Sequence, residues 1–288
     1  MTYRGRFAPS PTGQLHFGSL VAAVGSWLCA RHAGGEWLVR MEDIDPPREV
    51  PGAAADILAA LPAFGLVADA PALFQSQRTA AYDEAFAALR AADLVFPCTC
   101  SRSQLAASGG IHRDGHCIDG SHADREPAWR LRVSDVEIGF DDALLGPQRE
   151  RLRETVGDFV IRRADGFYSY QLACVVDDAF QGITEVVRGQ DLLDSTARQI
   201  WLQRCLGLTT PTYRHLPLVH DKAGNKLSKS SHAWPLDPGE PTPALRRALA
   251  FLGQALPDRP VDADALLAHA LTSFDPARLP HCSGSSPD

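Results

Sequence analysis

Apolar side chains follow two alternating patterns along the chain: stripes at helical spacing and short β-rich runs. The segment SLVAAVGSWLCARHAGG (19–35) has apolar residues at helical spacing and ends in a Gly-Gly pair, which predicts a helix with a glycine stop. The next run, EWLVRMED (36–43), has the length of a strand and ends in carboxylates. Helical patterns follow in AAADILAALPAFG (53–65) and TAAYDEAFAALRAADL (79–94).

The same alternation returns in the second half of the chain. FVIRR, YSYQLACVVDD and GITEVVRG indicate strands around a helix, and LLDSTARQIWLQRCLG predicts one more helix. A short helical pattern runs from about Pro243 to His269. Strands that alternate with helices predict an α/β fold with a Rossmann-type parallel sheet.

Between residues 97 and 155 the periodicity weakens, and Cys, His, Gly, Arg and Asp become frequent. This change of character predicts an insertion within the α/β core. We therefore divide the chain into four parts: the first half of a nucleotide-binding domain (1–96), the insertion (97–155), the second half (156–207), and a loop region with a short helical tail (208–288).

Composition and charge limit the function classes. The chain has 288 residues, 45% of them hydrophobic, and a net charge of −7, which argues against a protein that coats nucleic acid indiscriminately but allows RNA to dock on a local basic surface. No stretch approaches the roughly 18 uninterrupted apolar residues of a membrane span. Seven cysteines, an odd number, fit a reducing compartment. We expect a cytoplasmic monomer with no membrane partner.

Two short motifs suggest phosphate chemistry. In RFAPSPTGQLHFGS (6–19) the prolines stiffen a turn before a helix that begins near His16, where free N–H groups favour an anion. Gly18 would let a nucleotide lie close to the helix, and Ser19 could donate a hydroxyl hydrogen bond. In AGNKLSKSS (223–231), Lys226 and Lys229 suit a transferring polyphosphate. The alternative is a helix cap with an incidental histidine and a solvated lysine loop.

Taken together, the motifs resemble class I aminoacyl-tRNA synthetases of the glutamyl type. The family's HIGH-type motif corresponds to His16-Phe17-Gly18-Ser19, with serine in place of the last histidine, and its KMSKS motif corresponds to KLSKS (226–230). The resemblance covers residues 3–236. It includes RFAPSPTG, RMEDIDPPR, YSYQLACVVDD and EVVRGQDLL.

The resemblance implies ATP and L-glutamate as substrates. It also implies glutamyl-adenylate formation without need for tRNA, with Mg²⁺ accompanying ATP. His16, Lys226 and Lys229 would be catalytic, and loss of His16 or Lys229 should lower the rate roughly 10²–10³-fold. The ATP-binding residues would be His16, Gly18, Ser19 and Lys229.

Glutamate itself needs an anion for its ammonium group and cations for its carboxylates. Glu42 could accept the ammonium, and Arg6 and Arg188 are the guanidinium candidates. The alternative for Glu42 and Arg188 is a structural ion pair. The full set expected around glutamate is Arg6, Phe7, Ala8, Pro9, Ser10, Glu42, Tyr170 and Arg188.

Within the family, the chain is most similar to members that lack an anticodon-binding domain and glutamylate queuosine at the wobble position of tRNA(Asp). The HFGS motif and the roughly fifty residues after KLSKS support this, and tRNA(Asp) carrying queuosine is therefore the expected partner. Two alternatives stay open. One is a minimal glutamyl-tRNA synthetase that charges tRNA(Glu), and the other is a non-catalytic RNA-binding descendant.

The insertion contains a set of zinc-type ligands. Cys98, Cys100 and Cys117 with His112 offer sulfur and nitrogen donors suited to tetrahedral, structural Zn²⁺, with His116 as the alternative fourth ligand. Unligated loop cysteines are the other interpretation. Six arginines also make the insertion basic, and they either contact an RNA backbone or form a solvated face; they are Arg125, Arg130, Arg132, Arg149, Arg151 and Arg153.

Overall fold

The computed structural model describes residues 2–106, 109–112, 117, 125–220, 236–281 and 284–285. Lys226 and Lys229 of the KLSKS motif, and the alternative zinc ligand His116, lie outside these residues. Among the described helices, none combines the length and the apolar character that crossing a membrane requires.

The first half of the chain forms a parallel three-stranded sheet with connecting helices. The strand order is β1-β2-β3, and the helix α1 connects β1 to β2. Buried apolar residues on α1 explain why the predicted stripe forms a helix here. The elements are β1 (Arg4–Phe7), α1 (Phe17–His32), β2 (Glu36–Met41), α2 (Ala53–Ala63) and β3 (Leu73–Phe74).

A second sheet has the order β7-β6-β10-β9, in which β6, β10 and β9 are parallel and β7 is antiparallel. Its strands are β6 (Glu137–Asp142), β7 (Gly146–Arg151), β9 (Glu185–Gly189) and β10 (Thr212–Leu216). The two sheets meet next to β1, where the Thr184 N–H donates to Arg4 O at 2.9 Å and the Arg4 N–H donates to Thr184 Oγ1 at 2.8 Å. The carboxyl ends of β1 and β9 therefore lie side by side, at the kind of switch point where α/β proteins bind ligands.

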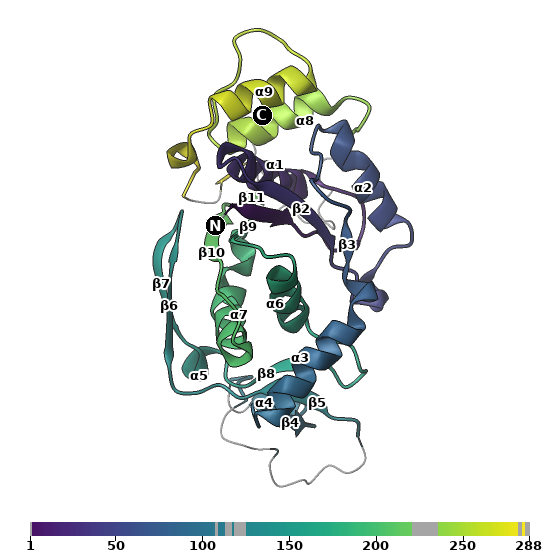
Figure 1. The fold of residues 1–288 in the computed structure, drawn as a ribbon, viewed down its shortest axis with the longest axis vertical. Helices are drawn as coiled ribbons and strands as arrows, with labels where there is room; N and C mark the ends of the chain where they lie inside the picture. The colour runs from purple at the N-terminus through teal and green to yellow at the C-terminus, as the bar shows by residue number, and fades with distance from the viewer. Residues whose placement is uncertain are drawn as a thin grey trace.

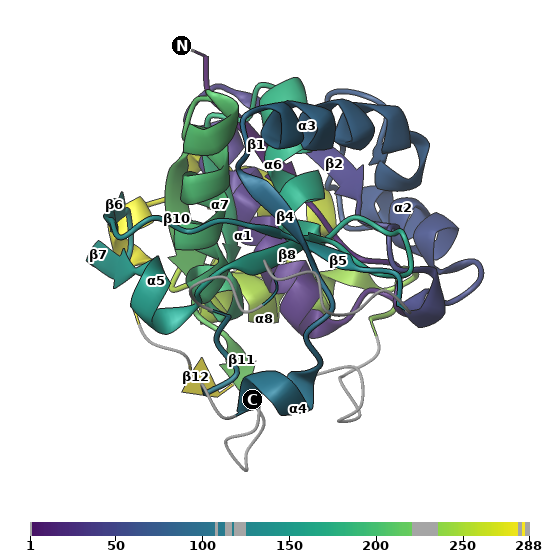
Figure 2. The same cartoon turned by 90° about the horizontal axis from the view of Figure 1, so that it is seen from below.

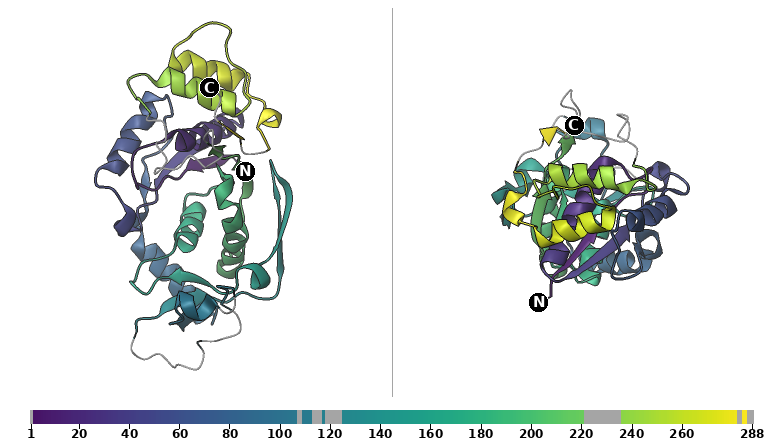
Figure 3. Two further views of the ribbon diagram at one scale, coloured as in Figure 1. Left: turned by 180° about the vertical axis from the view of Figure 1, so that it is seen from behind. Right: turned by 90° about the horizontal axis from the view of Figure 1, so that it is seen from above.

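Two hydrophobic cores lie on opposite faces of these sheets. One is built from α1 and α2 with α8 (Pro241–Phe251) and α9 (Ala263–Thr272), and Figure 3 shows α8 and α9 covering one end of the molecule. The other is built around α3 (Thr79–Ala91), α6 (Tyr170–Phe180) and α7 (Leu193–Leu206), as Figure 1 shows. The predicted helices and the α/β fold class are confirmed.

The opposite end of the molecule is a small antiparallel sheet, β4-β5-β8 (Figures 1 and 2). Its strands are β4 (Val95–Cys98), β5 (Ala128–Leu131) and β8 (Phe159–Arg162). Two short helices, α4 (Arg102–Ala106) and α5 (Leu152–Thr155), lie between these strands in the chain. The part of the predicted insertion that forms β6 and β7 pairs with β10 instead. The remaining elements are η1 (Pro46–Arg48), η2 (Gln75–Gln77), η3 (Gln190–Leu192), η4 (Pro276–Arg278), β11 (Val219–His220) and β12 (Gly284–Ser285).

Candidate active site

A cleft of about 650 Å³ opens at the carboxyl ends of β1 and β9. Every predicted glutamate- or ATP-site residue that the structure describes lines this cleft. The cleft is thus built from segments far apart in sequence, and the fold brings the two halves of the chain together around it. The residues are Arg6, Phe7, Ala8, Pro9, Ser10, His16, Gly18, Ser19, Glu42, Tyr170 and Arg188.

His16 is the N-cap of α1, as the sequence predicted for the start of this helix. Its backbone is extended, with φ −115° and ψ 167°, and its Nδ1 accepts a hydrogen bond from the Ser19 N–H at 3.3 Å. Ser19 Oγ lies 2.9 Å from His16 Nε2, so the ring is held against the first turn. That turn contains no acidic residue, and the positive end of the helix dipole borders the cleft. This end of the cleft therefore suits an anion.

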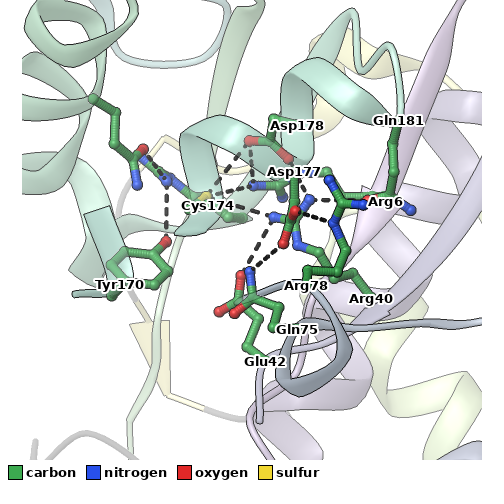
Figure 4. Close-up of polar contacts among 12 residues, drawn as sticks. Arg6, Arg40, Glu42, Gln75, Arg78, Tyr170, Cys174, Asp177, Asp178 and Gln181 are labelled. Atoms are coloured by element: carbon green, nitrogen blue, oxygen red, sulfur yellow. Dashed lines mark hydrogen bonds and ion pairs between the residues drawn. The ribbon is translucent and has the colours of Figure 1, made fainter. Parts of the chain in front are cut away.

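A buried cluster of charges lies beside the cleft, where β1, β2 and α6 meet (Figure 4). Asp178 Oδ1 accepts from Arg6 Nε at 3.0 Å and from Arg40 Nη1 at 2.6 Å. Burial alone would raise the pKa of Asp178, but the Arg40 and Arg6 guanidiniums outweigh it and hold the pKa well below its usual range. Asp178 therefore stays ionised and fixes both arginines.

Glu42 follows β2 and completes this cluster on the cleft side. Its Oε1 lies 3.3 Å from Arg40 Nη2, and its side chain is 9% exposed. Burial is the largest influence on the pKa of Glu42 and raises it, although Arg40 and Arg6 act in the opposite direction. A buried carboxylate that is costly to ionise is stabilised by an added positive charge, such as an amino-acid ammonium.

Arg188 is a buried cation on β9 that faces the cleft from the opposite side. Its Nη1 donates to Tyr170 Oη at 3.3 Å and to Gln199 Oε1 at 2.7 Å. Among the described residues it forms an ion pair with no carboxylate, so a structural ion pair does not account for its burial there. A buried guanidinium with only neutral direct partners favours an anionic ligand.

A second buried contact set holds α6 in place. Asp177 accepts from Arg78 Nε at 2.6 Å and from Gln75 Nε2 at 2.9 Å (Figure 4). It also accepts from Tyr82 Oη at 2.6 Å. Because Tyr82 lies on α3, these bonds fix α6 against α3. Asp178 also lies on α6, so the same hydrogen bonds hold Asp178 in position relative to Arg6 and Arg40.

The predicted metal ligands Cys98, Cys100, His112 and Cys117 converge in the region of the small antiparallel sheet, with their ligand atoms all within 4.8 Å of one another. Three sulfurs and one imidazole nitrogen are a donor set that fits a tetrahedral metal site. The buried His112 ring has its Nδ1 3.0 Å from Asp158 Oδ2, which leaves Nε2 for the metal. The described residues could therefore hold a metal, with His112 as the nitrogen ligand.

Electrostatics at this cluster agree with metal binding. Burial opposes ionisation of Cys117, but its hydrogen bonds with Cys100, His112 and Cys98 outweigh burial and lower the pKa of Cys117 to about 6. A thiolate is the form of cysteine that ligates metal.

Sequence reasoning assigned no role to several residues that shape the cleft. Arg40 and Asp178 lie within the quoted motifs RMEDIDPPR and YSYQLACVVDD. The signal for Arg40 was its charge inside the otherwise apolar run WLVRM, because a charged residue on a buried strand needs a partner. Asp142 and His215 contact each other at 2.6 Å but belong to no motif, so nothing in the sequence pattern pointed to them.

Fold and cleft together define a class of protein: a doubly wound α/β domain whose first helix begins at a histidine beside a cleft that suits an anion. The family model for the catalytic domain of class I tRNA synthetases (E and Q) matches residues 2–253. The chain belongs to this family of ligases, as the motifs predicted.

Several curated relatives match along nearly their whole length. A protein of Xanthomonas campestris pv. campestris (strain 8004) is 55% identical over 283 residues, covering 97% of this chain and 94% of the relative. One of Dechloromonas aromatica (strain RCB) is 58% identical over 264 residues, covering 89% and 88%. One of Burkholderia mallei (strain ATCC 23344) is 53% identical over 294 residues, covering 98% and 99%. All three are named glutamyl-Q tRNA(Asp) synthetase.

Solved structures of glutamate-tRNA synthetases share the fold. The enzyme from Elizabethkingia anophelis has a TM-score of 0.81 at 25% identity, and the match covers all of this chain and 68% of that one. A glutamate tRNA ligase from Elizabethkingia meningosepticum, solved in complex with its amino acid, has a TM-score of 0.82 at 25% identity, covering all of this chain and 67% of that one.

Proposed function

We propose that this enzyme activates L-glutamate with ATP, without need for tRNA, and then transfers the glutamate to queuosine in tRNA(Asp). The observation that carries the proposal is the 53–58% identity, over most of both chains, to relatives named glutamyl-Q tRNA(Asp) synthetase. The charge pattern of the cleft supports it independently, since it offers a carboxylate on one side and, on the other, a guanidinium that pairs with no carboxylate among the described residues.

Glutamate binds in this proposal with its ammonium at Glu42 and a carboxylate at Arg188. Tyr170, whose hydroxyl accepts from Arg188 at 3.3 Å, completes that side of the pocket. Arg6 lies on the same wall as Glu42, held by Asp178. Glutamine would leave a buried charge without its partner, so the site should reject it strongly. Phe7 and the residues Ala8, Pro9 and Ser10 form the floor of the cleft in this proposal.

In the first step a glutamate α-carboxylate oxygen attacks the α-phosphorus of ATP. The new P–O bond forms glutamyl-adenylate, and the bond to the bridging oxygen breaks to release pyrophosphate. His16 and the N-terminus of α1, with Gly18 and Ser19, would stabilise the phosphates, joined by Lys226 and Lys229 from the KLSKS loop. Mg²⁺ bound with ATP would neutralise part of the phosphate charge.

Pyrophosphate exchange tests the activation step. The purified enzyme with ATP, glutamate and labelled pyrophosphate, but no RNA, should form labelled ATP. Replacing glutamate by glutamine should reduce the exchange to background. Exchange that appears only after tRNA is added would contradict activation without tRNA.

The acceptor is tested by locating the transferred glutamate. After incubation with tRNA(Asp) that carries queuosine, ribonuclease digestion should leave labelled glutamate on the anticodon fragment. Label on the 3′-terminal adenosine would instead indicate an ordinary charging synthetase.

For the metal, we propose one structural Zn²⁺ held by Cys98, Cys100, His112 and Cys117. Four protein ligands close the coordination shell, which would leave no open position for catalysis. Cys117→Ser should lose the zinc measured by elemental analysis, while Cys205→Ser, a cysteine outside this cluster, should retain it. Full zinc content in Cys117→Ser would contradict the assignment.

A further inference from the structure

Asp142 and His215 form a buried polar pair for which the proposed chemistry has no role. Both side chains are 0% exposed, and Asp142 Oδ2 lies 2.6 Å from His215 Nδ1. The same oxygen accepts from the His215 backbone N–H at 3.1 Å. The other oxygen, Oδ1, accepts from the backbone N–H groups of Leu144 and Leu145 at 3.0 and 2.9 Å. Asp142 is therefore an acceptor at all of these contacts.

This geometry selects one form of the His215 ring. Because Asp142 accepts, Nδ1 must donate, which leaves Nε2 of the neutral ring as an acceptor. Nε2 lies 3.1 Å from Arg188 Nε, a group that can only donate. Thr196 Oγ1 lies 3.2 Å from the same nitrogen. A charged imidazolium would offer Arg188 no acceptor and would place a second positive charge beside it.

The charged and titratable surroundings of His215 favour the neutral ring. Burial is the largest influence on its pKa and lowers it, Arg188 and Arg6 lower it further, and Asp142 acts in the opposite direction. Tyr213, on the same strand, stacks on the ring at a centroid distance of 6.2 Å. The direction of the shift agrees with the hydrogen-bond geometry.

The contacts of the Arg188 guanidinium divide into two sets. Those made to groups outside the cleft lining are the shorter ones, and those made to groups that line the cleft are the longer ones. A ligand carboxylate can therefore replace the cleft-side contacts while the other set keeps the guanidinium in place. The first set is Gln199 Oε1 at 2.7 Å, Thr196 Oγ1 at 2.8 Å and His215 Nε2 at 3.1 Å; the second is Leu192 O at 3.2 Å and Tyr170 Oη at 3.3 Å.

We propose that His215 is a positioning residue for amino-acid binding: it donates from Nδ1 to Asp142, accepts at Nε2 from Arg188, and so aims that guanidinium at a substrate carboxylate. Asp142 acts one step further back by fixing the tautomer. The role in binding rests on the proposed function, because Arg188 is there assigned to a glutamate carboxylate. The tautomer itself does not depend on that function.

The first test is nitrogen NMR of the ¹⁵N-histidine-labelled protein at pH 7.5. The His215 signal, assigned by its loss in His215→Gln, should have the shifts of a neutral ring with the proton on Nδ1. A proton on Nε2, or a charged ring, would overturn the proposal whether or not the enzyme uses glutamate.

The second test uses Asp142→Asn in the pyrophosphate-exchange assay. Oδ1 accepts two strong backbone N–H hydrogen bonds and Oδ2 accepts one, so the amide oxygen of the variant should keep the Oδ1 position. The amide nitrogen should then replace Oδ2 and donate to His215 Nδ1, which moves the ring proton to Nε2. The KM for glutamate should rise roughly 10- to 100-fold, the scale of a lost hydrogen bond to a charged group, while the KM for ATP stays unchanged.

Two further variants separate positioning from mere stability. His215→Gln keeps an acceptor oxygen and should raise the glutamate KM less than His215→Leu, which has none. His32→Gln, at an exposed histidine, is the matched control and should leave both KM values unchanged. Equal rises in the KM for glutamate and for ATP in Asp142→Asn, or no rise, would overturn the positioning role. Absence of exchange in the wild-type enzyme would instead overturn the proposed function.

Discussion

Glu42 is a buried carboxyl group whose pKa is raised by burial, despite Arg40 and Arg6. A folded-state pKa above the unfolded one means that its contribution to stability is present below the ordinary value of 4.5 and is lost as the pH rises through the folded pKa. At neutral pH the ionised group therefore costs stability. This is the trade-off expected of a residue kept for binding.

Glu42→Gln should therefore keep or raise the Tm at pH 7.5, while the KM for glutamate rises roughly 10- to 100-fold through loss of a charged hydrogen-bond partner. Thermal unfolding and pyrophosphate exchange measure the two effects. Glu36→Gln is the control, since Glu36 pairs with Arg4 at a side-chain exposure of 46% and should change neither quantity appreciably. A large drop in Tm for Glu42→Gln would identify Glu42 as a structural ion-pair residue.

Asp178 has the opposite linkage. Its pKa is lowered by Arg40 and Arg6 against the effect of burial, so its stabilising contribution is present above the ordinary value of 3.8 and is lost as the pH falls through the folded pKa. Asp178→Asn leaves two buried guanidiniums short of a counter-charge and should lower the free energy of unfolding by about 3–5 kcal/mol.

Urea unfolding at pH 7 measures this loss. Asp165→Asn is the matched control, because Asp165 pairs with Arg163 at side-chain exposures of 42% and 41% and should cost only about 0–1 kcal/mol. Equal costs for the two variants would contradict the view that the charge cluster beside the cleft is strongly coupled.

Among the elements, the turn at Gly157 connects the small antiparallel sheet to the Cys/His cluster, which consists of Cys98, Cys100, His112 and Cys117. Gly157 has φ +65°, and a Cβ atom there would lie 2.1 Å from His112 O. The following residue, Asp158, donates its N–H to His112 O at 2.8 Å and holds the His112 ring through its carboxylate. The backbone and the side chain of Asp158 together therefore orient the His112 imidazole, the proposed nitrogen ligand.

Gly157→Ala should displace His112 and lower the metal content per chain measured by elemental analysis. Gly166→Ala is the control, because Gly166 also has a positive φ, +90°, but a Cβ atom there meets nothing within 4 Å. This variant should keep the metal, and backbone strain should lower its free energy of unfolding by only about 1–2 kcal/mol. Normal metal content in Gly157→Ala would show that this turn does not position the ligand.

Some secondary-structure elements could be predicted from the sequence and others could not. The helices were predictable because apolar residues recur along them at helical spacing, although α1 is buried on almost every side and therefore has no single apolar face. His16 could be placed at a helix start from the prolines before it. The strand β7, with the sequence GPQRER, lies at the edge of its sheet and lacks an apolar face. Its sequence therefore shows no alternation of apolar and polar residues from which a strand could be predicted. The Asp142–His215 contact joins residues 73 positions apart and depends on the pairing of β6 with β10, which periodicity does not encode.

At the scale of the whole molecule, the two sheets meet at one switch point, and the cleft there collects residues from both halves of the chain. The small antiparallel sheet, with the Cys/His cluster beside it, lies at the far end from α8 and α9 (Figure 1). In the proposed function the cleft activates the amino acid, and the RNA that then receives it remains to be identified by experiment.

The most direct measurement is transfer of labelled glutamate, in the presence of ATP, to three purified RNAs: tRNA(Asp) with queuosine, tRNA(Asp) with unmodified guanosine, and tRNA(Glu). We predict label on the queuosine-containing tRNA(Asp) alone. Label on tRNA(Glu) would contradict the proposed function and would indicate a minimal charging synthetase. Label on none of the three RNAs would favour a non-catalytic RNA-binding protein.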